Sequence, residues 1–389
     1  MTTHSTLLRK AGPVPGLPSL RAAAVGLIVL GAALLFVAPA VMSSFQLGQM
    51  GRFVCYAIVA IGIGLAWGRG GMLTMGQGAF FGLGAYFMAM NMKLSDAALG
   101  GDTVPDFMKL AGKELPLWWQ PFSSLPFTLA MIVVGPAIVA GGMGYLIFKR
   151  RVKGSYFAIL NQALVAAVVV LLIGQQDTLG GSNGLSGFQS FMGLSLYDPV
   201  NKYSIYMMAA SALVVMLAGY YFLMRSRFGE LLVATRDAEE RVRFLGYDPA
   251  TIKTVAYILA AIAAAVAGAL FVPIVGIISP AEIGVVPSIS FVIGVAVGGR
   301  ASLFGPVLGA LAVAWAENYF AESFPSQWSY FQGALLIVVI LVLPGGVASL
   351  TSLWKRRTTS RKQKMHSDEG SSGSPGNATK LADAAHVSA

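Results

Sequence analysis

Apolar runs of about 20 residues recur along the whole chain, and they constrain its fold more than any other feature. Each run is long enough to cross a hydrocarbon core of roughly 30 Å as a helix. The runs are continuous and do not alternate between apolar and polar residues, so they predict helices and not the strands of a barrel. With 56% hydrophobic and 11% charged residues among 389, we expect an all-α polytopic membrane protein.

The runs predict about ten membrane-spanning helices within a transmembrane domain at residues 22–350. They are expected at 22–42, 50–68, 72–92, 125–148, 156–174, 203–224, 252–275, 284–299, 303–320 and 330–350. The first run is too long for the apolar core of a signal peptide, so we interpret it as an uncleaved span that follows an N-terminal segment, 1–21. The polar, Ser/Gly-rich tail at 351–389 is predicted to be disordered.

The basic residues predict the orientation of these spans. With ten crossings, most of the 27 lysines and arginines fall on one side, and the positive-inside rule makes that side cytoplasmic. Both termini are then expected in the cytoplasm. The net charge of +10 is interpreted as orientation and contact with anionic lipid, with no nucleic-acid partner.

The longest charged stretch, 225–250, lies between two predicted spans on the cytoplasmic side. Apolar residues with helical spacing predict one amphipathic helix at 230–246, and this apolar stripe consists of Leu231, Ala234, Ala238, Val242 and Leu245. Gly246, followed by Asp248-Pro249, is expected to end the helix.

Two acid-first pairs four residues apart, Asp237–Arg241 and Glu239–Arg243, should stabilise this helix. A solvated loop or a helix lying on lipid headgroups is the simpler alternative. Mixed charges, however, suit a charged protein partner. The residues predicted to dock a cytoplasmic subunit are Glu230, Arg236, Asp237, Glu239, Glu240, Arg241 and Gly246.

The sequence lacks the residue patterns that ATP hydrolysis, metal binding or enzymatic catalysis would need. There is no G-x-x-x-x-G-K-[ST] phosphate loop, so the chain is not expected to hydrolyse ATP itself. The three histidines lie near the termini and Cys55 is the only cysteine, so neither an enzyme nor a metal site is expected, and no cofactor. Proton or sodium coupling generally needs ionisable groups at membrane depth. The acids nearest the membrane, Glu282 and Glu317, fall by the outer boundaries of the predicted spans, so energy supplied by a separate subunit fits better than self-powered transport.

Uncharged polar residues and glycines within the predicted spans indicate a candidate translocation path. The hydroxyl and amide groups need partners in hydrocarbon, and Gly78 and Gly82 form a G-x-x-x-G pair. The candidates are Thr74, Gln77, Gly78, Gly82, Asn161, Gln162, Ser182 and Asn183. Helix packing, bonds between helices and ordinary turn chemistry are the structural alternatives.

Five stretches resemble the branched-chain amino acid and urea family of ABC transporter permeases. They are "GGMLTMGQGAFFGLGAY" (70–86), "GGSNGL" (180–185), "SRFGELLVATRDAEERVRFLGYDP" (226–249), "FVPIVGIISPAEI" (271–283) and "VGGRASLFGPVLGA" (297–310). In the docking segment, Glu240 and Gly246 match the ends of the Glu-Ala-Ala-x-x-x-Gly pattern of ABC permeases, while Arg241 and Val242 replace the alanines.

Within that family, the M-like subunit of the urea-transporting branch resembles the chain most. The stretches that indicate it are "VPDFM" (104–108), "KELP" (113–116) and "FPSQWSYFQGALLI" (324–337). The resemblance implies import of urea or short amides across a bacterial cytoplasmic membrane. It also implies a homologous second permease, two ATPases that use ATP, and an external urea-binding protein as partners. A branched-chain amino acid permease and a passive urea or amide channel are the alternatives.

Overall fold

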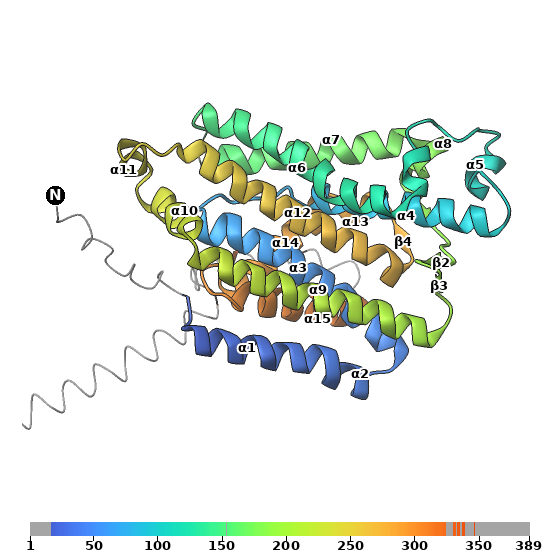
Figure 1. The fold of residues 1–389 in the computed structure, drawn as a ribbon, viewed down its shortest axis with the longest axis horizontal. Coiled ribbons are helices and arrows are strands. Elements are labelled where there is room, and N and C mark those ends of the chain that lie inside the picture. Colours follow the sequence, from blue (N-terminus) through green and yellow to red (C-terminus); the bar gives the residue numbers. More distant parts are fainter. Residues whose placement is uncertain are drawn as a thin grey trace, which may run out of the picture.

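The computed structural model describes residues 17–152 and 154–323, together with residues 330, 331, 333, 334, 337, 338 and 346. Most of the predicted span at 330–350 and all of the tail at 351–389 lie outside the described residues. Long helices run side by side along the longest axis of the molecule (Figure 1). The expectation of a helical protein is confirmed.

Six helices in the described part are long and apolar enough to cross a membrane. Two of them contain π-helical turns: Leu20–Val41 joins α1 (Leu20–Ala32), η1 (Ala33–Val37) and α2 (Ala38–Val41), and Ser44–Arg69 joins α3 (Ser44–Ile63) and η2 (Gly64–Arg69). The other four are α6 (Leu125–Lys149), α7 (Ser155–Gly174), α9 (Pro199–Arg225) and α12 (Pro249–Val275). The predicted count of about ten spans is not confirmed.

Three further helices lie where spans were predicted but are not among these six. They are α4 (Gln77–Leu99), α14 (Val285–Gly298) and α15 (Gly305–Ser323). The 14 residues of α14 extend about 21 Å, which is too short to cross a bilayer. Helix α4 begins five residues later than the span predicted at 72–92, and it is buried along most of its length, so it does not need the apolar surface of a lipid-facing helix.

Short elements connect the long helices. On the chain they are α5 (Asp106–Leu110), η3 (Gln120–Ser123), α8 (Gln176–Leu179), η4 (Gly181–Asn183), β1 (Leu185–Ser186), β2 (Ser190–Phe191), β3 (Leu194–Ser195), α10 (Arg227–Asp237), α11 (Glu239–Phe244), β4 (Ile277–Ile278) and α13 (Pro280–Ile283). The strands form two antiparallel pairs, β1 with β4 and β2 with β3.

The connecting elements gather at two ends of the bundle. Helices α10 and α11 lie at one end, which we call the basic end, and α5, α8, β2 and β3 lie at the opposite end (Figure 1). Helix α13 lies near the middle of the long axis (Figure 1). This position places a chain break within the length of the bundle and not at one of its ends.

The centre of the bundle is α12, which packs against α3, α4 and α6. Its contact with α4 is a backbone contact: a side chain at Gly84 would overlap with the carbonyl of Ala265, and one at Gly268 would overlap with the carbonyl of Phe81. Small residues allow helices to approach this closely, and close packing is the main source of helix association in a membrane.

Local signals explain where the central helices begin. A capping box joins Ser43 and Gln46, so α3 starts at Ser44, six residues before the predicted span. Asp248 accepts a hydrogen bond from the Ala250 amide (3.2 Å), and Pro249 occupies the first position of α12.

Candidate functional site

Two non-helical segments enter the interior of the bundle from opposite ends. After η2 ends at Arg69, residues 71–76 have no regular structure, and α4 starts at Gln77. After α12 ends at Val275, the chain passes through β4 and α13 before α14 starts at Val285. Each segment therefore takes the place of a helical piece, so that a helix begins inside the protein.

The starts of α4 and α14 lie against each other. A side chain at Gly78 would overlap with the hydroxyl of Ser288 and the carbonyl of Ile283, and one at Gly82 would overlap with the Ile283 side chain. We call residues 70–82 together with 283–288 the central junction. Irregular backbone is tolerated at membrane depth only where protein shields it, and Met72, Thr74 and Gly76 are indeed buried.

Three of the predicted path residues carry buried polar groups that lack hydrogen-bond partners in the described part of the chain. Thr74 and Gln77 are fully buried, and the Thr74 hydroxyl and both amide atoms of Gln77 make no hydrogen bond there. Both amide atoms of Gln162 are likewise buried and unpaired. An unsatisfied buried polar group costs about 1–3 kcal/mol, so these groups oppose folding in the state that the structure shows.

Asn161 is satisfied by hydrogen bonds, in contrast to its neighbour Gln162. Its side-chain amide donates to the Phe157 carbonyl (2.8 Å), and the Tyr257 hydroxyl donates to its Oδ1. The Asn161 Oδ1 also lies 2.7 Å from the position that a Cβ of Gly76 would take. The structure therefore brings α7 and α12 to the central junction through Asn161 and Tyr257, and sequence reasoning missed Tyr257.

Ser182 and Asn183 lie in a loop that contacts α13 but do not enter the central junction. Both are exposed in η4, in a loop whose glycines permit close backbone contact: a side chain at Gly184 would overlap with the Ile278 carbonyl. The Asp96 carboxylate fastens the next part of this loop by accepting hydrogen bonds from the amides of Gln189 (2.8 Å) and Ser190 (2.9 Å). The loop thus covers β4 at the end of the bundle opposite the basic end.

One charged group lies inside a long helix where the sequence analysis expected an outer boundary. Because α3 begins at Ser44, Arg52 is two turns within it. Its Nε donates to the Tyr56 hydroxyl (2.8 Å), and its guanidinium carbon lies 5.5 Å from the centre of the Tyr56 ring.

The charged segment at the basic end is two helices, not the single helix predicted at 230–246. The chain breaks at Ala238, whose φ of −151° and ψ of 67° are not helical, between α10 and α11. The predicted apolar stripe is therefore wrong at two positions: Ala234 is exposed and Leu245 is 76% exposed. Val242 is buried as predicted, and the other buried side chains are Leu232, Val233 and Thr235. The predicted stop at Gly246 agrees with its φ of +88°.

The break at Ala238 also changes the ion pairs. Glu239 pairs with Arg243 (3.3 Å) as predicted, but Asp237 pairs with Arg236 (2.7 Å) and not with Arg241, because Asp237 and Arg241 lie in different helices. The hydrogen bonds from Arg236 hold the pKa of the exposed Asp237 carboxyl below its usual value.

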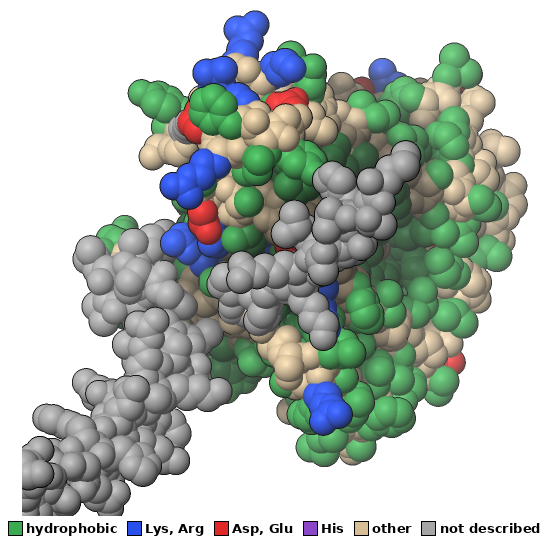
Figure 2. All heavy atoms as spheres, turned by 60° about the vertical axis from the view of Figure 1, so that its left-hand side comes forward, with side chains coloured by type: hydrophobic (Ala, Val, Ile, Leu, Met, Phe, Trp, Pro, Cys, Tyr) green, Lys and Arg blue, Asp and Glu red, His purple; other side chains and the backbone are tan. Residues whose placement is uncertain are grey.

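Further ion pairs fix the second of these helices in place. Glu239 also pairs with Lys253 of α12 (2.6 Å), and Glu240 pairs with Arg243 (3.2 Å). Figure 2 shows basic and acidic side chains interspersed at this end of the molecule. The acids at the surface are thus largely occupied by local partners.

Arg236 connects this segment to the central junction. Its guanidinium donates to the carbonyl of Gly68 (2.8 Å) at the end of η2. A Cβ at Gly71 would lie 2.7 Å from the Arg236 Cγ, so α10 contacts the very residues that lead into the junction. On its other side, Gly68 packs against the Arg300 carbonyl, and the Arg300 guanidinium stacks over the Trp67 ring at 4.9 Å.

Fold and site together define a class of protein: a polytopic membrane permease whose helices are interrupted inside the bundle. Discontinuous helices that begin at a buried polar site are typical of transport proteins. The sequence family described as "Branched-chain amino acid transport system / permease component" matches residues 47–340. The chain belongs to this family and is a permease subunit of an ABC importer of the branched-chain amino acid type.

Curated relatives agree with this assignment. The chain is 25% identical over 322 residues to the high-affinity branched-chain amino acid transport system permease protein LivM of Escherichia coli, covering 76% of this chain and 68% of LivM. It is 26% identical over 301 residues to BraD of Pseudomonas aeruginosa (75% and 91%) and 25% identical over 307 residues to LivH of Salmonella typhimurium (75% and 90%). No solved structure matches the chain significantly. These relatives fit the alternative cargo, a branched-chain amino acid, better than urea.

Proposed function

We propose that this permease subunit imports branched-chain amino acids and that its central junction is the point where the substrate is bound on its way through. The proposal rests above all on the unpaired, fully buried polar groups of Thr74 and Gln77 at the start of α4. A substrate that hydrogen-bonds to them during transport would offset the free energy that they cost in its absence. The choice of cargo rests on the relatives LivM, LivH and BraD, which are named as permeases of branched-chain amino acid transport systems.

The arrangement at the junction suits a zwitterion better than urea. Two helices, α4 and α14, begin there, and the positive end of a helix dipole stabilises a carboxylate. Urea carries no charge and gains little from that field. The neutral amides of Gln77 and Gln162 could accept hydrogen bonds from either substrate or donate to it. The preference for an amino acid over urea therefore rests on the two helix starts.

The energy would come from ATPase subunits that bind the charged segment at 225–250. Movement of α10 would reach the junction through the Arg236 hydrogen bond to Gly68 and the non-helical residues that follow. A homologous second permease and an external binding protein would complete the importer, and ATP would be bound by the ATPases and not by this chain.

Uptake by proteoliposomes that contain the whole importer tests the cargo. With binding protein outside and ATP inside, we expect accumulation of radiolabelled leucine, with urea moving no faster than in empty liposomes. Removing ATP or using an ATPase-dead partner should abolish leucine accumulation. Uphill urea accumulation without leucine uptake would contradict the proposed cargo, and uptake that persists without ATP would contradict the whole mechanism in favour of a channel.

A further inference from the structure

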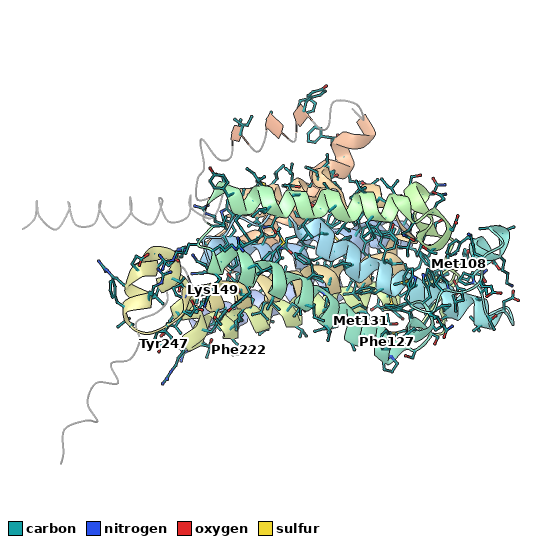
Figure 3. The ribbon with its side chains drawn as sticks, turned by 90° about the horizontal axis from the view of Figure 1, so that it is seen from above. Met108, Phe127, Met131, Lys149, Phe222 and Tyr247 are labelled. Carbon is teal, nitrogen blue, oxygen red and sulfur yellow. The ribbon has the colours of Figure 1, made fainter. Side chains whose placement is uncertain are left out.

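A basic cavity lies at the basic end of the bundle, beside the segment that would meet an ATPase. Its volume is about 360 Å³, and it is formed by the end of α6 and the connection between α11 and α12. The lining residues are Phe148, Lys149, Arg151, Arg243, Gly246, Tyr247, Asp248 and Ala250. Figure 3 shows Lys149 and Tyr247 at the same end of the molecule, far from Met108 at the other end.

Three cationic side chains, Lys149, Arg151 and Arg243, and one carboxylate, Asp248, line this cavity. Arg243 is neutralised by Glu239 and Glu240, and the Asp248 carboxylate already accepts from the Ala250 amide and the Thr251 hydroxyl (2.9 Å). The Asp248 carboxylate acts electrostatically on Lys149 but forms no close ion pair with it, and Arg151 forms no ion pair with any residue that the structure describes.

The backbone holds Arg151 in a conformation that glycine adopts more readily. Its φ is +58°, and it follows α6 as the left-handed residue of a Schellman motif, in which the amides of Arg151 and Val152 donate to Phe148 (3.0 Å) and Ile147 (3.2 Å). A side chain at such a position has a conformational cost that glycine avoids. This conformational cost falls on Arg151, whose side chain lines the cavity.

The surface next to the cavity is apolar and continues along α6. Tyr145 and Leu146 are 47% and 62% exposed, and the Lys149 ammonium lies 5.7 Å from the centre of the Tyr145 ring. In a membrane, this face of α6 would meet acyl chains, while Tyr247, 50% exposed, would lie at the headgroup level where tyrosine is enriched.

We propose that this cavity binds the phosphate of an anionic phospholipid of the inner leaflet, with the acyl chains along Tyr145 and Leu146. Lys149 and Arg151 hold the phosphate, as basic pockets between helices do on the cytoplasmic side of membrane proteins. Because Gly246, Tyr247 and Asp248 also line the cavity, the bound lipid fixes the connection between α11 and α12 against α6. The inference does not depend on the cargo of the permease.

Native mass spectrometry of the delipidated full-length chain with its partner subunits tests this site. Phosphatidylglycerol, phosphatidylcholine and inorganic phosphate are titrated separately. We expect phosphatidylglycerol to bind at least tenfold more tightly than phosphatidylcholine, and the double variant Lys149→Gln/Arg151→Gln to lose that difference. The matched control, Arg21→Gln/Arg150→Gln, removes the same charge from exposed positions that do not line the cavity, and it should change the affinity less than twofold.

A single variant, Arg151→Gly, guards against misfolding as an explanation. Glycine suits the left-handed backbone, so this variant should fold at least as well as the parent and still bind phosphatidylglycerol several-fold more weakly. Equal lipid affinity in all variants would overturn the proposal. Displacement of the lipid by equimolar inorganic phosphate would also overturn it and would assign the cavity to free phosphate. Loss of ATPase-subunit capture with unchanged lipid binding would overturn it too and would assign the cavity to the ATPase.

Discussion

The central junction and the charged segment at 225–250 are built on opposite principles. In the junction, glycines pack against backbone carbonyls, and the buried polar groups of Thr74 and Gln77 lack hydrogen-bond partners in the described part of the chain. In the charged segment, short helices lie at the surface and acids such as Glu239 and Glu240 pair with bases a few residues away. The junction is therefore specified by shape, and the segment by charge.

This difference predicts how each region responds to change. Shape complementarity between backbones fails when a single carbon is added, whereas partly exposed ion pairs contribute little individually. A region that forms an occluded path needs close shape complementarity between its helices. A surface that binds another protein needs charged side chains, which keep it hydrated when the partner is absent.

Gly78→Ala should have the largest effect. The added methyl group would overlap with the Ser288 hydroxyl and the Ile283 carbonyl, and overpacking of this kind costs about 1–3 kcal/mol or more. We expect a lower thermal unfolding temperature in detergent and loss of leucine uptake.

Gly142→Ala is the matched control for Gly78→Ala. Gly142 lies within α6, and a Cβ there would meet nothing within 4 Å. Since alanine favours a helix over glycine by about 0.8–1 kcal/mol, the control should be neutral or slightly stabilising. If both variants unfolded at the same temperature as the parent, specification of the junction by shape would be wrong.

Gln77→Leu separates a transport role from a structural one. Because the Gln77 amide has no described partner, its replacement should leave thermal stability unchanged or raise it, while leucine uptake falls more than tenfold. Asn91→Leu provides the contrast: it removes the hydrogen bond to the Phe122 carbonyl (2.8 Å) and should cost about 1–2 kcal/mol of stability. Normal uptake by Gln77→Leu would remove this residue from the path.

Arg236→Gln should uncouple the two regions. It loses the hydrogen bond to Gly68 and the pair with Asp237, so we expect ATP hydrolysis by the assembled importer to continue while leucine accumulated per ATP falls about fivefold, equivalent to roughly 1 kcal/mol of coupling. Arg150→Gln, which removes an exposed cation elsewhere at the basic end, should leave this ratio unchanged. An unaltered ratio in Arg236→Gln would show that motion reaches the junction by another route.

Glu239→Gln should have the smallest effect of the four. It weakens the contacts with Arg243 and Lys253, and the loss should be about 1 kcal/mol of stability, measurable as a small shift in unfolding temperature that salt diminishes. A shift as large as that of Gly78→Ala would end the distinction between the two regions.

The long apolar helices could be predicted from the sequence because hydropathy is a local property. The helices at 125–149, 155–174 and 249–275 depart from their predicted limits by only a few residues. The position of the charged segment and the helix stop at Gly246 were also predictable, since both depend on nearby residues. The break at Ala238 was not, because the buried contacts of Leu232 and Val242 override the simple helical period.

The interruption before α14 is visible in the sequence, although the span predicted at 284–299 did not take it into account. Pro280, Gly284 and Pro287 follow one another within eight residues, and prolines and glycines that interrupt an apolar segment point to a discontinuous helix. The segment before Gln77 is likewise rich in glycine. Neither signal reveals that the two interruptions meet.

By itself, the sequence determined that this chain is a helical membrane protein, which surface carries the mixed charges, and which permease family it resembles. Only the tertiary structure decided that α4 and α14 begin side by side, that Tyr257 satisfies Asn161 while Gln77 has no described partner, and that Arg236 contacts Gly68. The physical reason is that a helix in lipid forms wherever apolar residues continue, whereas it can stop inside the bundle only where other helices shield its backbone. Such shielding is a contact between residues far apart in the chain.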